Sequence, residues 1–358
     1  MRAVTYHGRK DIRVEDVEQE AVGRGQVRIE IDSCGICGSD LHEYTAGPIF
    51  VPDDEPHPVS QETAPIRMGH EFSGTVSDVG EGVTGLDSGD AVAVNPILSC
   101  GKCRQCREGN YHICDSIGFI GLSGGGGGFA ESVVLDAEHA VALGDDVPIE
   151  YGALVEPLTV ALHAVRRSGL HSGDSVAVFG AGPIGLAVIQ CARVAGARSI
   201  FVSEPREARR DRAVACGADE LIDPSNADPV EYIASNTDGG VDVSFEVAGV
   251  EASFNAAIES TVPSGQMTVV SIWEEKVSTH PNNLVLGERT VTGTLAYLGG
   301  PRSDEEYGMV IDMLADGRLD PDPFITDQIG LEEIVDDGFE RLIDPESDHI
   351  KILVKPND

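Results

Sequence analysis

Residues 173–205 read GDSVAVFGAGPIGLAVIQCARVAGARSIFVSEP. The stretch passes from a short apolar run through a glycine-rich turn into a longer apolar run, and then into a second short run that ends at an acid. This order predicts strand, turn, helix and strand, the opening of a doubly wound α/β domain. Gly180, Gly182 and Gly185 fit Gly-x-Gly-x-x-Gly, in which the glycines allow a tight turn, approach of a pyrophosphate and close helix packing. We therefore expect a dinucleotide to bind at this turn.

The acid that ends the second predicted strand bears on the choice of dinucleotide. Glu204 lies 24 residues after Gly180, where a carboxylate can hold the ribose hydroxyls of the adenosine and repel a 2′-phosphate. This position favours NAD over NADP, and it favours a ribose contact over an exposed turn acid. Arg206, Arg209 and Arg210 follow directly and could each meet a phosphate, so NADP stays open.

The rest of the chain divides by its pattern into two expected domains. A chain of 358 residues exceeds the usual size of one domain, about 100–200 residues. Short alternating stretches before residue 150 predict an irregular β domain, and further apolar runs after residue 205 predict more strands of the parallel sheet. A predicted helix (304–317) and a final strand (349–356) are expected to pack back on the first domain. The predicted domains are 1–156 with 298–358, and 157–297.

The charge of the chain is strongly negative. Asp and Glu number 61 against 25 Lys and Arg, which gives a formal net charge of -36, and only five of the basic residues are lysine. Binding to nucleic acid or to anionic membranes requires a basic surface, so neither partner is expected. Scattered acids in such excess favour a salt-adapted protein over a merely acidic one. No targeting segment or membrane span is visible, and we expect a cytoplasmic protein.

Four cysteines form the strongest local pattern. The segment CGKCRQCREGNYHIC (100–114) supplies thiolates at spacings that let one loop curl around a tetrahedral ion. A structural zinc is favoured over disulfides, which a reducing compartment disfavours, and over an iron–sulfur cluster, which the first three spacings also permit. We expect a closed zinc lobe over about residues 96–115, held by Cys100, Cys103, Cys106 and Cys114.

Three weaker fragments gain meaning together. SCGICGSDLH (33–42) contains Cys37, MGHEFSG (68–74) contains His70 and Glu71, and Glu156 precedes Pro157. Singly, each residue is better explained as a surface or packing residue. Together they supply the thiolate, imidazole and carboxylate ligands of a catalytic zinc that keeps one position open.

With these segments assembled, the chain resembles the zinc-dependent medium-chain alcohol and polyol dehydrogenases over nearly its whole length. The fold implied is α/β, with a GroES-like irregular β catalytic domain and a Rossmann doubly wound parallel-sheet coenzyme domain. Within the family, three stretches are most similar to the 2,3-butanediol dehydrogenase branch. They are HEYTAGPIF (42–50), GFIGLSGGGGGFAE (118–131) and VSEPREARR (202–210).

The resemblance assigns roles to individual residues. It implies two zinc ions per chain, and a catalytic one held by Cys37, His70 and Glu156, with Glu71 as an alternating ligand. Ser39 and His42 fall where the family has a proton relay. Lys351 falls where a basic residue reaches the cofactor pyrophosphate. The cofactor residues expected in all are Gly180, Gly182, Pro183, Ile184, Gly185, Glu204, Arg209 and Lys351.

The function implied is NAD(H)-dependent interconversion of a secondary alcohol or vicinal diol and a ketone, with 2,3-butanediol and acetoin as the expected pair. Sorbitol, sugar and L-threonine 3-dehydrogenases share the framework and remain alternatives. A zinc-stabilised NAD-binding module without turnover would not need Cys37, His70 and Glu156 together, and a zinc-free quinone reductase would lack both metal sets. The branch also implies a homotetramer or homodimer.

Three further features carry smaller expectations. The run SGGGGG (123–128) is typical of a flexible loop. His57 could border the substrate cleft, although a solvent-facing loop histidine is the favoured interpretation. Cys34 is expected to be a buried packing residue and not the partner of Cys37 in a redox pair.

Overall fold

The computed structural model describes residues 1–273 and 275–357, and the chain forms two compact units. Unit 1 comprises Met1–Glu156, Tyr297–Asp316 and Ile325–Asp358, and unit 2 comprises Pro157–Ala296 and Gly317–Phe324. The predicted boundary kept 317–324 in the first domain. This segment belongs to unit 2 because the side-chain amide of Gln190 bonds both backbone groups of Asp320, accepting from N–H at 2.7 Å and donating to C=O at 2.8 Å.

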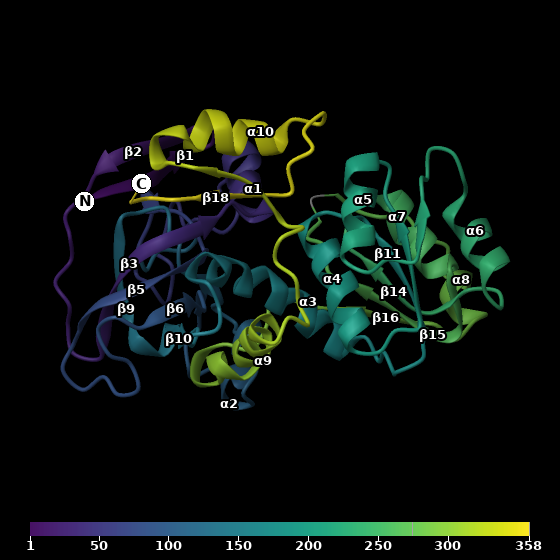
Figure 1. The fold of residues 1–358 in the computed structure, drawn as a ribbon, viewed down its shortest axis with the longest axis horizontal. Helices are drawn as coiled ribbons and strands as arrows, with labels where there is room; N and C mark the ends of the chain where they lie inside the picture. The colour runs from purple at the N-terminus through teal and green to yellow at the C-terminus, as the bar shows by residue number, and fades with distance from the viewer. Residues whose placement is uncertain (274, 358) are drawn as a thin grey trace. The chain divides into compact units, whose positions relative to one another are not determined.

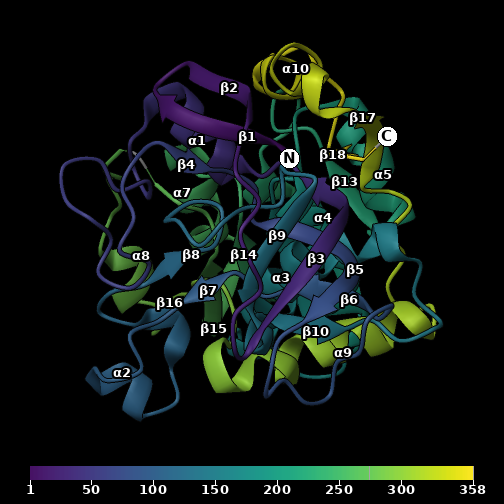
Figure 2. The same ribbon diagram turned by 90° about the vertical axis from the view of Figure 1, so that its left-hand side faces the viewer.

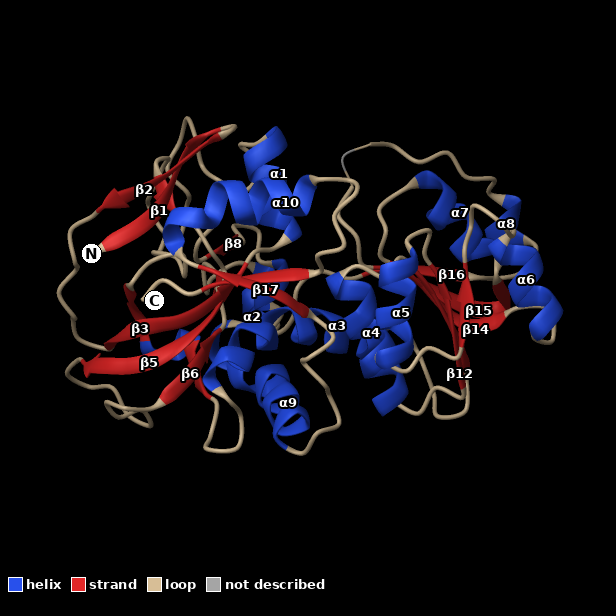
Figure 3. Cartoon of the chain, turned by 45° about the horizontal axis from the view of Figure 1, so that its top comes forward, coloured by secondary structure: helices blue, strands red, loops and turns tan. Residues whose placement is uncertain are grey.

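Unit 2 is a parallel sheet with helices on both faces, which confirms the doubly wound fold. The strand order is β13-β12-β11-β14-β15-β16, and the neighbouring strands pair in parallel. Helices α4 and α5 cover one face, and α6, α7 and α8 cover the other (Figures 1 and 3). The elements are α3 (Val155–Arg167), β11 (Ser175–Phe179), α4 (Pro183–Val194), β12 (Ser199–Ser203), α5 (Glu207–Ala215), β13 (Glu220–Ile222), α6 (Pro229–Asn236), β14 (Val241–Glu246), α7 (Glu251–Glu259), β15 (Thr261–Val269), α8 (Asn282–Val285) and β16 (Thr290–Gly293).

The order of these strands places a ligand crevice by topology. It is the 3-2-1-4-5-6 order in which dinucleotides bind outside the carboxyl ends of the strands, where the direction of the connections reverses. The central strands β11, β12 and β14 are mostly buried because helices cover both faces of the sheet, whereas the edge strand β16 is largely exposed. Phe179, Phe201 and Met267 belong to a buried hydrophobic cluster of unit 2.

Unit 1 is built on an antiparallel sheet with one parallel pair. Its order is β10-β6-β5-β3-β18-β17, and β9 also pairs with β3 (Figure 2). The elements are β1 (Arg2–Gly8), β2 (Asp11–Asp16), β3 (Gln26–Gly35), α1 (Gly38–Ala46), β4 (Ile66–Arg67), β5 (Glu71–Val79), β6 (Ala91–Val94), β7 (Ile97–Leu98), α2 (Arg104–Arg107), β8 (Gly118–Phe119), β9 (Ser132–Asp136), β10 (Ala140–Ala142), α9 (Ser303–Ala315), β17 (Ile325–Ile329), α10 (Glu340–Ile343) and β18 (Lys351–Val354). Shorter 3₁₀ and π turns connect them.

The register of this sheet sets the position of the site. Gly35 at the end of β3 pairs with Glu71 at the start of β5 and with Leu353 of β18. A Cβ on Gly35 would lie 2.4 Å from Glu71 Oε2, so only glycine leaves room for that carboxylate. The end of β3, the start of β5 and a residue of β18, which are distant in sequence, therefore meet at one end of the sheet.

The glycine run at 123–128 is not a flexible loop. Most of its residues are buried, and Gly124, Gly125 and Gly126 all have positive φ, a backbone conformation that other residues rarely adopt. A Cβ on Gly128 would lie 2.5 Å from the Phe72 side chain. The glycines therefore let a tight turn pass through the packed interior of unit 1.

Among residues 1–273 and 275–357, no helix has the length and apolar character needed to cross a membrane.

Candidate active site and metal centres

Helix α1 begins at the first candidate ligand. The backbone N–H of Cys37 donates to Asp40 Oδ2 at 2.9 Å, which fixes the first turn and the direction of the Cys37 side chain. Ser39 Oγ lies 4.0 Å from Cys37 Sγ. His42 is one turn further along α1, three residues from Ser39, and such residues share a helix face.

His70 comes from the segment that enters β5. Its Nδ1 lies 3.4 Å from Asp40 Oδ1, and both side chains are buried. Burial opposes protonation of this imidazole, but Asp40 and the Cys37 thiolate outweigh it and raise the pKa of His70. Asp40 orients both the Cys37 backbone and the His70 ring, and an acid that supports a ligand in this way is typical of metal sites. Asp40 was not among the predicted site residues, although its place within SCGICGSDLH could have indicated it.

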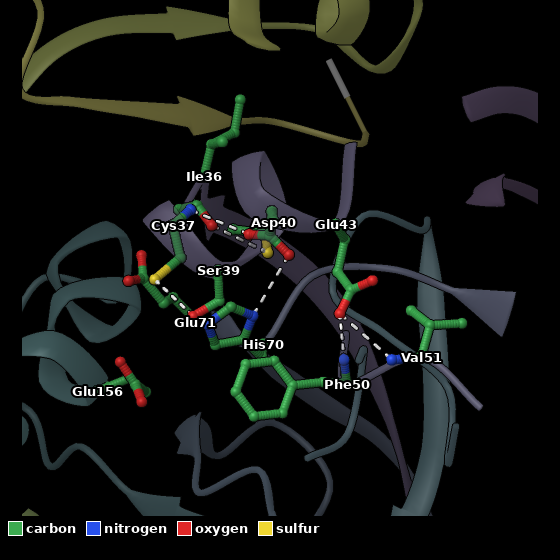
Figure 4. A network of polar contacts seen from close by, with 12 residues as sticks. Ile36, Cys37, Ser39, Asp40, Glu43, Phe50, Val51, His70, Glu71 and Glu156 are labelled. Carbon is green, nitrogen blue, oxygen red and sulfur yellow. Dashed lines mark hydrogen bonds and ion pairs between the residues drawn. The ribbon is translucent and has the colours of Figure 1, made fainter. Parts of the chain in front are cut away.

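Cys37, His70 and Glu71 converge. Their ligand atoms all lie within 4.8 Å of one another, as Figure 4 shows from close by. One sulfur, one nitrogen and one carboxylate oxygen in a mostly buried position fit a zinc ion, because these are the ligand types that zinc prefers. When bound, zinc supplies Lewis acidity that lowers the pKa of a hydroxyl group.

Glu156 faces the same space from the start of α3 (Figure 4). It is buried, and its Oε1 accepts a hydrogen bond from the Tyr297 hydroxyl at 2.7 Å. Burial and the nearby Glu71 carboxylate raise the pKa of Glu156 to about 7. Tyr307 donates in turn to the Val94 carbonyl at 3.0 Å and lies 3.3 Å from the Tyr297 hydroxyl. These tyrosines carry no motif in the sequence and could not be found from it.

Lys351 forms a buried ion pair within unit 1. Its ammonium donates to both oxygens of Glu71 at 2.8 and 2.6 Å and to the Ile36 carbonyl at 3.0 Å, and the residue is 1% exposed. Burial lowers the pKa of Lys351, but the Glu71 carboxylate raises it further and the net shift is upward. This ion pair forms because β18 lies beside β3, and a contact of Lys351 with the cofactor pyrophosphate stays a prediction.

The four-cysteine lobe forms a second metal set. The sulfurs of Cys100, Cys103, Cys106 and Cys114 lie within 4.8 Å of one another, and all four thiols are free. Backbone N–H groups point at them: Cys103 donates to Cys100 Sγ at 3.4 Å, and Ser116 donates to Cys114 Sγ at 3.3 Å. The N–H groups of Asp115 and Cys106 lower the pKa of Cys103 to about 6. Converging sulfurs with amide donors fit a structural zinc.

The glycine-rich turn of unit 2 has the predicted geometry. Gly180 follows β11 with φ of 106°, and a Cβ on Gly185 would lie 2.0 Å from the Gly180 carbonyl oxygen. Gly182 precedes α4, which begins with Pro183 and Ile184, and a Cβ on Gly182 would lie 3.8 Å from Arg209 Nη1. The helix N-terminus and a guanidinium thus lie beside the turn, an arrangement that suits a pyrophosphate.

Glu204 is a buried acid and not an exposed turn residue. Its Oε2 accepts from the Ala181 N–H at 2.9 Å and its Oε1 from the Arg206 N–H at 3.0 Å. Arg210 donates to the backbone carbonyls of Glu204 and Pro205 at 2.8 and 2.6 Å. The end of β12 is therefore tied to the glycine-rich turn.

Two smaller predictions have different outcomes. Cys34 is fully buried and free, as expected for a packing residue. His57 is partly buried, contrary to the solvent-facing interpretation, because its Nε2 lies 3.2 Å from the Ile117 carbonyl and its Nδ1 accepts from Val59 and Ser60 at 3.4 Å.

The chain belongs to the zinc-binding alcohol dehydrogenase family. Residues 23–145 match the alcohol dehydrogenase GroES-like domain, and residues 183–316 match the zinc-binding dehydrogenase domain. With both metal sets present, it is a zinc-dependent alcohol dehydrogenase.

Individual relatives span the whole chain. It is 46% identical to the (R,R)-butanediol dehydrogenase of Bacillus subtilis and 39% identical to that of Neisseria gonorrhoeae, in each case over 100% of both chains. Among solved structures, it matches 2R,3R-butanediol dehydrogenase from Bacillus subtilis with a TM-score of 0.93 and 46% identity, over 99% of each chain.

Proposed function

We propose that this enzyme interconverts 2,3-butanediol and acetoin with NAD(H). The observation that carries the proposal is the convergence of Cys37, His70 and Glu71 beside the Ser39 hydroxyl. Full-length similarity to relatives named butanediol dehydrogenase supports the diol substrate.

The residues of α1 would carry the proton. Ser39 Oγ accepts the hydroxyl proton of the alcohol, and His42 delivers the proton toward water. NAD⁺, which would be held at the turn of Gly180 and Gly182 beside Arg209, would supply the hydride acceptor, so that alcohol and NAD⁺ give ketone, NADH and one proton. Asp40 holds the Cys37 backbone and the His70 ring in place throughout.

NAD is proposed over NADP because of Glu204. A buried carboxylate fixed at the end of β12 suits ribose hydroxyls and opposes a 2′-phosphate. Arg209, beside Gly182, is proposed to contact the pyrophosphate.

Kinetics and metal analysis test the proposal. The purified protein in molar salt is assayed with butanediol isomers, acetoin, sorbitol, glucose and L-threonine, each with NAD and with NADP. We expect the highest kcat/KM for a 2,3-butanediol isomer with NAD, and two zinc ions per chain by mass spectrometry. A preference for sorbitol or threonine would replace the substrate proposal, and one zinc without turnover would favour a binding module.

A homodimer or homotetramer is proposed as well. Strand β16 lies at the edge of the unit 2 sheet, where Val291 is 37% exposed. Val285 and Leu286 nearby are 68% and 81% exposed. An edge strand with exposed apolar neighbours can pair with a second copy. Light scattering in molar salt measures the oligomeric state.

We also propose that the protein comes from a salt-adapted organism, on the strength of its net charge of -36.

A further inference from the structure

A buried carboxylate at the end of α1 has no part in the chemistry described so far. Glu43 is fully buried, and its side chain faces the backbone of the loop that follows the helix. Glu43 Oε2 accepts from the Ile49 N–H at 2.9 Å, and Oε1 accepts from the Val51 N–H at 3.2 Å and from the Phe50 N–H. One carboxylate thus gathers three successive amides, and charge-assisted bonds of this kind are stronger than neutral ones.

The turn between helix and loop is shaped around this carboxylate. The Gly47 N–H donates to the Glu43 carbonyl at 3.0 Å. A Cβ on Gly47 would lie 2.5 Å from Glu43 Oε2 and 2.6 Å from the Tyr6 hydroxyl. The contact leaves no room for a side chain, so Glu43 and the loop are packed to fit one another.

Phe50, at the centre of the three amides, is held from two further sides. Its carbonyl accepts from Ser123 Oγ at 3.2 Å, and its ring packs edge-on against Phe119 with centroids 5.9 Å apart. Ser123 belongs to the glycine run at 123–128. This run makes a second hydrogen bond to the loop between α1 and β4, because the Gly125 N–H donates to Glu62 Oε1 at 2.8 Å. The glycine run is therefore the second support of Phe50.

Figure 4 shows where this support directs the ring. In this view the Phe50 ring points toward His70. A substrate bound at the ligand set would therefore have polar groups, the ligands and Ser39, on one side and the apolar Phe50 ring on another. A hydroxyl suits the first, and a short alkyl group suits the second.

We infer that Glu43 is a positioning residue that fixes Phe50 as an apolar wall of the substrate site, and that this wall selects short alkyl substituents on the reacting carbon. The inference rests on the proposed function, which supplies the secondary alcohol. Phe50 limits the size of the alkyl group that the site accepts, and Glu43 affects this selection only by holding Phe50 in position.

The test compares two diols that differ by one methylene at each end. For wild type and variants in molar salt with zinc, kcat/KM is measured for 2,3-butanediol and 3,4-hexanediol, alongside zinc content and melting temperature. Phe50→Ala should shift the ratio toward hexanediol about tenfold, since a methylene in an apolar pocket changes discrimination by about 10-fold or more. The change should appear mainly in KM, and Phe50→Leu should give a smaller shift in the same direction.

Glu43→Gln keeps one acceptor but loses the charge, and should move the ratio the same way about threefold, with zinc content unchanged. Glu55→Gln, an exposed acid of the same loop, is the matched control and should leave the ratio unchanged. If Glu43→Gln does not fold, Ser123→Ala tests the clamp through the Phe50 carbonyl, and an unchanged ratio there overturns the positioning role.

An unchanged ratio in both Phe50 variants overturns the wall. If the wild-type enzyme oxidises neither diol, the proposed substrate is overturned and the wall is not. The size test then compares 2-butanol with 3-hexanol, or another secondary alcohol that the wild-type enzyme oxidises with its longer homologue.

Discussion

At the scale of single residues, Ser39 offers the sharpest test of the proton path. Its hydroxyl lies 4.0 Å from Cys37 Sγ, on the helix face that also carries His42. Ser39→Ala should lower kcat about 10²-fold or more without loss of zinc, because a positioned proton acceptor contributes on that order. Ser39→Thr keeps the hydroxyl and should retain most of the turnover. Unchanged kcat in the alanine variant, at full zinc content, would exclude Ser39 from the path.

The residue scale also shows what a sequence can indicate about a site. Cys37, His70 and Glu71 were predictable because each lies in a short segment with family character, although none was informative alone. The ion pair of Lys351 was not predicted, since the Glu71–Lys351 contact spans 280 positions and arises only when β18 lies beside β3. Tyr297 could not be found for the same reason, because its partner Glu156 is distant in sequence.

At the scale of elements, Asp242, the second residue of β14, bonds to Ser175, the first residue of the neighbouring parallel strand β11. Its Oδ2 accepts from both the N–H and the Oγ–H of Ser175 at 2.7 Å. Burial raises the pKa of Asp242, but these donors outweigh it, and the net pKa falls below the ordinary value of 3.8. A carboxyl whose folded pKa is lowered stabilises the fold above its unfolded pKa, and that stability is lost as pH falls through the folded pKa.

Asp242→Asn should therefore lower the free energy of unfolding by about 1 kcal/mol at pH 7 and by less near pH 3. Urea denaturation at constant salt measures the difference. Asp238→Asn, an exposed acid in the turn before β14, is the control and should show neither effect. An equal loss at pH 7 and pH 3 would mean that the charge of Asp242 contributes nothing.

Elements were more predictable than their packing. The strands of unit 2 follow from apolar runs and from the glycine-rich turn, since helices cover both faces of the sheet. The run at 123–128 was misjudged because glycine composition does not distinguish a loose loop from a buried turn with positive φ. Only the surrounding atoms, such as the Phe72 side chain against Gly128, make that distinction.

At the scale of the whole molecule, the net charge of -36 opposes the compact state. Repulsion between surface carboxylates acts over about 10 Å at 0.1 M salt and about 3 Å at 1 M. The melting temperature should therefore rise on the order of 10 °C between 0.1 and 2 M KCl, since each kcal/mol corresponds to about 2–4 °C in a protein of this kind.

A sucrose control separates two effects of salt on the melting temperature, the screening of surface charges and the exclusion of the solute from the protein surface. Sucrose at matched osmolality also stabilises compact states, because it is excluded from protein surfaces, but it does not screen charge. We expect KCl to raise the melting temperature well beyond sucrose, and most of the rise to occur below about 1 M, where the Debye length shortens most. Zinc content is measured at each salt concentration, so that loss of metal is not mistaken for repulsion. Equal effects of KCl and sucrose would mean that charge repulsion does not limit stability, and the salt-adapted origin would lose its support.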